Sequence, residues 1–142
     1  MRQFPGKWLE IARPEVDYQG YDLVAEENGI VRHIQLKTSR VGARTSRQKV
    51  HVALGRKPSG CVVWIYFHEE TLELGPFLYF GGAAGYPLPD LSEQKVAQHS
   101  KGNTEGVKAR SPDHRVINKG QFASYGRIAE LYSVLFGPPR RA

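Results

Sequence analysis

Cysteine is nearly absent from this sequence of 142 residues, and its scarcity limits the sites that the chain can form. Cys61 stands alone, so no intrachain disulfide is possible and clusters of thiolate metal ligands are excluded. Because Cys61 lies in the apolar run 61–67, a small buried thiol is the natural interpretation. We therefore expect it to be a core residue.

Long apolar runs are also missing. No segment approaches the roughly 20 apolar residues of a membrane-spanning helix, and the N-terminus lacks the apolar stretch of a secretory signal. We therefore expect a cytoplasmic protein with no membrane partner. The length suits one domain, and the hydrophobic share of 40% and the charged share of 24% match soluble globular proteins. We expect a single domain over residues 1–142.

Positive charge, by contrast, is in excess. The net charge is +6 and the isoelectric point is near 9.6, which favours anionic partners through long-range attraction. Nucleic acid is the commonest partner of this kind. A solvated surface rich in Lys and Arg explains the same balance, so the charge alone does not choose between the two.

Residues 20–26 and 29–38 are predicted to form two neighbouring strands. The first segment alternates apolar and polar residues, and the second is rich in β-branched residues. Between them, Asn28 followed by Gly29 is the strongest short-range signal for a two-residue type I′ turn, because both positions need positive φ. We therefore expect a β-hairpin whose register can be counted outward from this turn.

The register of this hairpin brings three polar side chains together. Counting from the turn places Asp22 opposite Gln35, and directly opposed residues share a face with Cβ atoms about 5 Å apart. Lys37 lies on the same face, two residues and about 7 Å farther along the strand. Ile34 and Leu36 occupy the other face and supply the core contact that fixes the register. An acid, an amide and an amine are thus expected to converge.

The rest of the chain is predicted to mix strands and helices. We expect an irregular edge strand over 7–16, a helix over 46–54, a buried central strand over 61–67, a turn over 68–71, a strand over 76–82, a short helix over 91–99, a short strand over 115–118 and an amphipathic helix over 120–136. These elements favour an α/β fold.

The converging residues have the chemistry of a magnesium site. Hard cations such as Mg²⁺ prefer oxygen ligands and keep several waters, so one carboxylate with one or two other oxygens can hold them. Asp22 could supply the carboxylate, Gln35 its side-chain carbonyl, and Leu36 its backbone carbonyl. Lys37 would then position the attacking water or the phosphate. This set of groups suits hydrolysis of a phosphodiester with Mg²⁺ or Mn²⁺ as cofactor.

The pattern resembles the PD-(D/E)xK nuclease superfamily, which has the restriction-endonuclease-like fold. Its signature is an Asp on one strand and a Glu or Gln, any residue, then a Lys on the next, across a hairpin. Here those residues are Asp22 and the "QLK" of Gln35 to Lys37. The resemblance covers most of the chain and implies an α/β domain with a mixed central sheet flanked by helices. It also implies an endonuclease that acts on DNA and that could work as a homodimer.

Two features depart from the superfamily pattern. Its members usually open with a helix that carries a further metal-binding carboxylate, but only Met1 to Gly6 precede the first expected strand, so this helix is reduced or absent. Glu10, Glu15 or Asp17 could replace that carboxylate, and we favour Asp17. In addition, Gln35 stands where a carboxylate is usual, which removes one negative charge and weakens cation binding.

A run of basic residues from 40 to 57 follows the expected site directly. Arg40, Arg44, Arg47 and Lys49 are its candidates for contacts to a nucleic-acid backbone, although a solvated helix face is an equal alternative. The histidines show no paired spacing that would indicate zinc.

Less specific interpretations remain for the motif itself. Asp22 could cap the entry of its strand, while Gln35 and Lys37 could lie on the solvated face of a hairpin. The chain could then be a catalytically inactive nucleic-acid-binding module of the same fold. It could also be an interaction or assembly domain that pairs through a strand edge or its C-terminal helix.

Overall fold

The computed structural model describes residues 10–14, 20–27, 29–92, 94–102 and 108–137. In this part of the chain, a six-stranded mixed sheet has the order β1 (Glu10–Ala12), β2 (Leu23–Glu27), β3 (Ile30–Arg40), β5 (Gly60–Phe67), β6 (Leu74–Gly81) and β9 (Ala123–Tyr125). A second sheet has the order β4 (Arg47–His51), β8 (Lys108–Asn118) and β7 (Lys95–Gly102). The helical elements are η1 (Val52–Arg56), η2 (Lys119–Gln121) and α1 (Ile128–Phe136).

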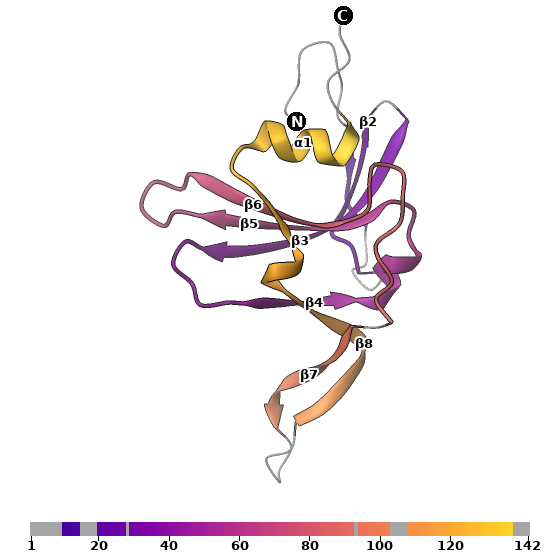
Figure 1. Ribbon diagram of the computed structural model, residues 1–142, viewed down its shortest axis with the longest axis vertical. Coiled ribbons are helices and arrows are strands. Elements are labelled where there is room, and N and C mark those ends of the chain that lie inside the picture. Colours follow the sequence, from indigo (N-terminus) through magenta and orange to yellow (C-terminus); the bar gives the residue numbers. More distant parts are fainter. Residues whose placement is uncertain (1–9, 15–19, 28, 93, 103–107, 138–142) are drawn as a thin grey trace, which may run out of the picture.

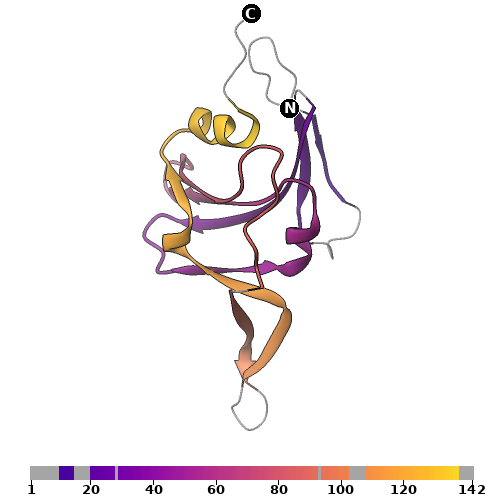
Figure 2. The same ribbon diagram turned by 45° about the vertical axis from the view of Figure 1, so that its right-hand side comes forward.

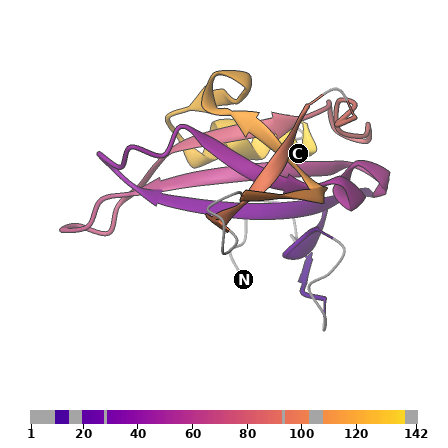
Figure 3. The ribbon, with the colours of Figure 1, turned by 90° about the horizontal axis from the view of Figure 1, so that it is seen from below.

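The central sheet lies between α1 and the second sheet (Figure 1). Each of its faces carries its own core. One core joins β5 residues such as Trp64 to Val50 of β4 and Ile117 of β8, and the other joins Val63 to Leu131 and Leu135 of α1. The β7–β8 hairpin extends away from the rest of the molecule (Figure 2). From below, strands of the second sheet cross over those of the central sheet (Figure 3).

The hairpin predicted from Asn28 and Gly29 is confirmed in its register. Strands β2 and β3 pair antiparallel, with Glu27 opposite Ile30 and Val24 opposite His33. Gly29 has a φ of +78°, as a turn of this kind needs. Asn28 lies outside the described residues. β3 then pairs in parallel with β5, which is buried at the centre of the sheet as expected for 61–67.

The predicted α/β class with flanking helices is not what the structure shows, because the protein is mainly β. The helix expected over 46–54 is strand β4 followed by the short 3-10 helix η1. Val50 is buried in the core, while Arg47 and Lys49 are exposed on the opposite face. This alternation is that of a strand, and its partner β8 lies far along the sequence, where a local pattern cannot reveal it.

The other two predicted helices are also revised. The region expected to be helical over 91–99 contains strand β7 from Lys95. The C-terminal helix begins only at Ile128 rather than near 120. Phe122 instead packs edge-on against Trp64 at a centroid distance of 5.4 Å, and β9 pairs with β6. The aromatic residues at helical spacing therefore serve two different cores.

Other expectations fall partly or wholly outside the described residues. The edge strand expected over 7–16 is present as β1, but residues 1–9, where a reduced N-terminal helix would lie, are not described. In the described part of the chain, no helix is long and apolar enough to cross a membrane.

A buried arginine connects β3 to the end of α1. Arg32 is fully buried, and its Nε donates to the Leu135 carbonyl at 2.8 Å. Its Nη2 lies 3.2 Å from the Val134 carbonyl and 3.3 Å from the Gly82 carbonyl. Helix C-termini leave carbonyls without partners inside the helix and carry a partial negative charge. Arg32 therefore fixes α1 to the sheet.

Candidate functional site

Asp22 lies at the edge of β3, just beyond the last pair of the β2–β3 ladder. That ladder ends at Leu23 opposite Ile34, one pair before the predicted pair of Asp22 with Gln35. Instead, the Asp22 N–H donates to the Ile34 carbonyl at 2.8 Å. Its carboxylate Oδ2 accepts a hydrogen bond from the Leu36 N–H at 2.6 Å. The two contacts flank Gln35, and the second also fits the alternative in which Asp22 caps a strand end.

Gln35 carries a buried oxygen that has no hydrogen-bond partner among the described residues. The residue lies opposite Val62 of β5, and its Oε1 has no hydrogen-bond partner within the described part of the chain. A buried acceptor left unpaired costs about 1–3 kcal/mol. Such atoms in native proteins therefore require an explanation, of which a bound ion is one. Gln35 thus has a buried acceptor oxygen, and it is the residue between the two that Asp22 contacts.

The backbone of Leu36 points toward the same edge of β3. Its N–H is directed at the Asp22 carboxylate, and the N–H and C=O of one strand residue point to the same side. The Leu36 carbonyl is therefore also directed to the edge that β2 leaves unpaired. This end of the hairpin thus contains the Asp22 carboxylate, the Gln35 amide and the Leu36 backbone carbonyl.

Lys37 follows Gln35 on the same face of β3. It lies opposite Trp64 of β5, which belongs to the core beneath the second sheet. Because alternate strand residues share a face, both Gln35 and Lys37 face the second sheet and are half-buried. The ammonium group of Lys37 helps to lower the pKa of His114 on β8. Lys37 is therefore one of the charged groups that influence His114.

The remaining metal-ligand predictions find less support. Asp17 lies outside the described residues. Among the residues that the structure describes, no group of three or more His, Cys, Asp or Glu could hold a metal ion. A cation here would depend on one carboxylate together with the neutral oxygens of Gln35 and Leu36. Mg²⁺ tolerates such sparse protein ligation because it keeps several waters.

The four predicted nucleic-acid contacts lie on different elements rather than on one helix. Arg40, at the end of β3, lies 3.9 Å from Glu69 in an exposed ion pair. Arg44 is exposed in the loop that follows. Arg47 and Lys49 are exposed on the outer face of β4. All four are thus available to solvent, but only the last two share a regular surface.

Two histidines that the sequence did not single out lie close to this region. His51 of β4 and His114 of β8 are directly opposed, with ring centroids 5.0 Å apart. A methyl group added at Gly20, where φ is +82°, would come within 2.7 Å of the His51 Cβ. His51 therefore packs against the segment that leads into Asp22. Only the pairing of β4 with β8 could have revealed this cluster.

His33 lies on the face of Gln35 but has other partners. Its Nδ1 lies 2.7 Å from the Pro58 carbonyl, to which it donates. Its ring meets that of Tyr21 edge-on at 5.0 Å. These contacts explain His33 as a structural residue.

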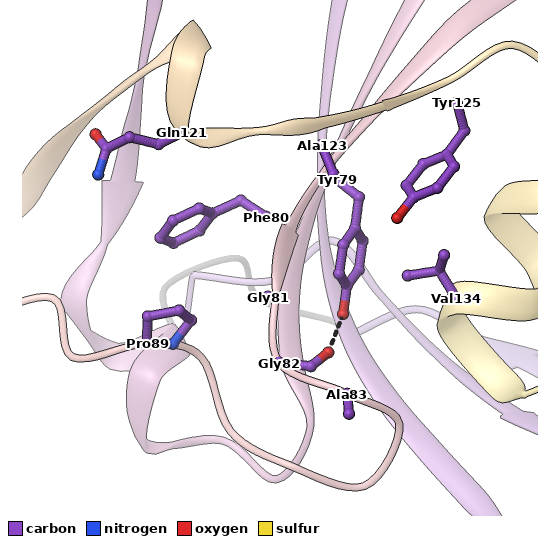
Figure 4. Close-up of a pocket in the computed structure, with 10 residues that line it drawn as sticks. All are labelled: Tyr79, Phe80, Gly81, Gly82, Ala83, Pro89, Gln121, Ala123, Tyr125 and Val134. Carbon is purple, nitrogen blue, oxygen red and sulfur yellow. Dashed lines mark hydrogen bonds between the residues drawn. The ribbon is translucent and has the colours of Figure 1, made fainter.

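A separate open pocket of about 340 Å³ lies at the end of β6 (Figure 4). Its lining includes Tyr79, Phe80, Tyr125 and Val134, with no charged side chain among its residues. The Tyr79 hydroxyl donates to the Gly82 carbonyl at 2.6 Å. None of the predicted site residues lines this pocket, so it does not coincide with the β3 edge.

Comparisons with known proteins do not identify the chain: no family model matches it, and no curated protein or solved structure shows significant similarity.

Proposed function

We propose that this protein hydrolyses phosphodiester bonds of DNA with Mg²⁺ or Mn²⁺ held at the edge of β3. The protein ligands are the Asp22 carboxylate, the Gln35 Oε1 and the Leu36 carbonyl. The observation that carries the proposal is the buried Gln35 oxygen, which lacks a hydrogen-bond partner in the described part of the chain. Gln35 is the residue between Ile34 and Leu36, the two residues of β3 that Asp22 contacts.

Each group has a separate role in the proposed reaction. A divalent cation supplies Lewis-acid polarisation of the phosphate when it is bound. Lys37 holds the phosphoryl oxygens and stabilises the negative charge that develops on them. Arg44, Arg47 and Lys49 contact backbone phosphates, so that affinity for DNA falls as salt rises. Because Gln35 is uncharged, we expect the site to bind the cation more weakly than a site with two carboxylates.

The test is nicking of supercoiled plasmid in Mg²⁺ or Mn²⁺, compared with the same reaction in EDTA. Asp22→Asn should abolish nicking because it removes the single charged ligand. Lys37→Gln should slow it about 10²- to 10³-fold, as loss of a transition-state donor does. The matched controls Asp90→Asn and Lys95→Gln change exposed residues outside the site and should retain the wild-type rate.

A gain-of-function variant tests the role of Gln35 directly. Gln35→Glu replaces the amide oxygen Oε1 with a carboxylate, so half-maximal nicking should require a lower Mn²⁺ concentration. Equal activity of Asp22→Asn and wild type would overturn the proposal. DNA binding without any cleavage would favour the inactive module. Stable oligomers without salt-dependent DNA binding would favour the assembly domain.

A further inference from the structure

The paired histidines of the second sheet form a cluster that the proposed hydrolysis does not use. His51 and His114 are opposed across the β4–β8 ladder, and both are half-buried. Their neighbours Val50 and Ile117 point into the core, so the two imidazoles lie on the outer face of the sheet. Residues far apart in the chain are thus brought to one point.

The orientation of His51 is fixed by its own backbone. Its Nδ1 accepts a hydrogen bond from the Ala53 N–H at 3.0 Å, where it caps η1. An imidazole nitrogen that accepts carries no proton, so the proton of neutral His51 lies on Nε2. His51 can therefore donate a hydrogen bond from Nε2 without losing its cap.

The charges around His114 favour an anion. Burial lowers the pKa of His114 below its usual value of 6.5, and the charges of His51, Lys37 and Lys49 lower it further. Asp113 acts in the opposite direction and raises the pKa. Lys37 comes from β3, Lys49 and His51 from β4, and Asp113 from β8 itself. A negatively charged ligand next to His114 would act in the opposite direction and favour its protonated form.

We propose that His51 and His114, together with Lys49, bind a backbone phosphate of nucleic acid next to the segment that leads into Asp22. This inference rests on the proposed function for its ligand, DNA, but not for catalysis. The contact of His51 with Gly20 places the cluster beside the segment that leads into Asp22. The phosphate would accept hydrogen bonds from the imidazoles and a charge-assisted bond from Lys49.

Binding at this cluster must be coupled to protonation of His114. A bound phosphate stabilises the imidazolium form and raises the pKa of His114, so each binding event takes up protons. Affinity should therefore increase as pH falls from about 8 to about 5. The phosphate contacts that lie elsewhere on the protein involve Lys and Arg, whose charges do not change over this range.

The experiment measures fluorescence anisotropy of a labelled DNA duplex in EDTA, so that no metal-dependent cleavage can occur. Wild-type affinity should rise about threefold to tenfold between pH 8 and pH 5, because the rise equals the factor by which a bound phosphate strengthens proton binding at His114. His114→Gln should lose this dependence and bind more weakly at low pH. His51→Asn, whose side chain can still cap η1, should weaken binding at both ends of the range. Thermal melts verify that each variant folds.

The control is His68→Gln, which changes an exposed histidine in the turn after β5. It should bind like wild type at every pH. Equal pH dependence in wild type and His114→Gln, or no DNA binding in EDTA, would overturn the phosphate cluster. Histidine-dependent binding without Mg²⁺-dependent nicking would refute the proposed hydrolysis and leave the cluster intact. If the histidine variants nick and bind DNA like wild type, the phosphate cluster is refuted and the proposed hydrolysis is kept.

Discussion

Replacement of Arg32 by methionine tests the link between the central sheet and α1. The guanidinium group donates to the Leu135, Val134 and Gly82 carbonyls, and methionine fills similar space without a donor. Hydrogen bonds to charged groups contribute about 1.5–3 kcal/mol each. Part of this is offset by the burial of the charge, because Nη1 has no partner within the described residues.

The net expected loss for Arg32→Met is about 3–5 kcal/mol of unfolding free energy. Domains of this size have only about 5–15 kcal/mol in total, so the midpoint of thermal unfolding should fall by about 10–15 °C. Urea denaturation followed by circular dichroism measures the change. Hydrogen exchange should locate it, with amides of α1 losing protection before those of β5.

Arg40→Met is the matched control for this substitution. Arg40 is 56% exposed and its ion pair with Glu69, itself 63% exposed, spans 3.9 Å, so its removal should cost less than about 1 kcal/mol. If Arg32→Met and Arg40→Met destabilise the protein equally, Arg32 does not hold the helix end and the reasoning fails.

Two further predictions concern titratable groups. Burial raises the pKa of Cys61 to about 12, so the native thiol should resist a disulfide reagent at about pH 8 and react only after unfolding; rapid labelling of the native protein would contradict this. Because folding lowers the pKa of His114, the unfolded chain binds more protons below pH 6.5 and stability should fall as the pH drops through that value. His114→Gln should flatten this part of the urea stability profile, and an unchanged slope would show that another group is responsible.

The parts of the fold that could be predicted depend on local signals. Gly29 follows Asn28 at a two-residue turn, and this dipeptide fixes the β2–β3 register. The apolar run of β5 needs two covered faces, which also marks it as a central strand. Gln35 and Lys37 share a face for the same local reason, the alternation of a strand.

The parts that could not be predicted depend on partners far along the chain. β4 contains a pattern that suits either a helix or a strand, and only its pairing with β8 decides between them. The same pairing creates the His51–His114 cluster, which no sequence spacing indicates. Asp22 could be placed near Gln35 from the turn, but its bond to the Leu36 N–H depends on where the ladder ends.

The order of the strands also determines when the second sheet can form during translation. β4 has emerged long before β8, its partner in the described structure, has been translated. Until then its unpaired edge is open to other chains. Pairing across such a separation in sequence is slow, because a long loop must close first. Nascent chains halted after β4 has emerged and before β8 has been translated should therefore depend on chaperones, even though the β2–β3 hairpin can already form.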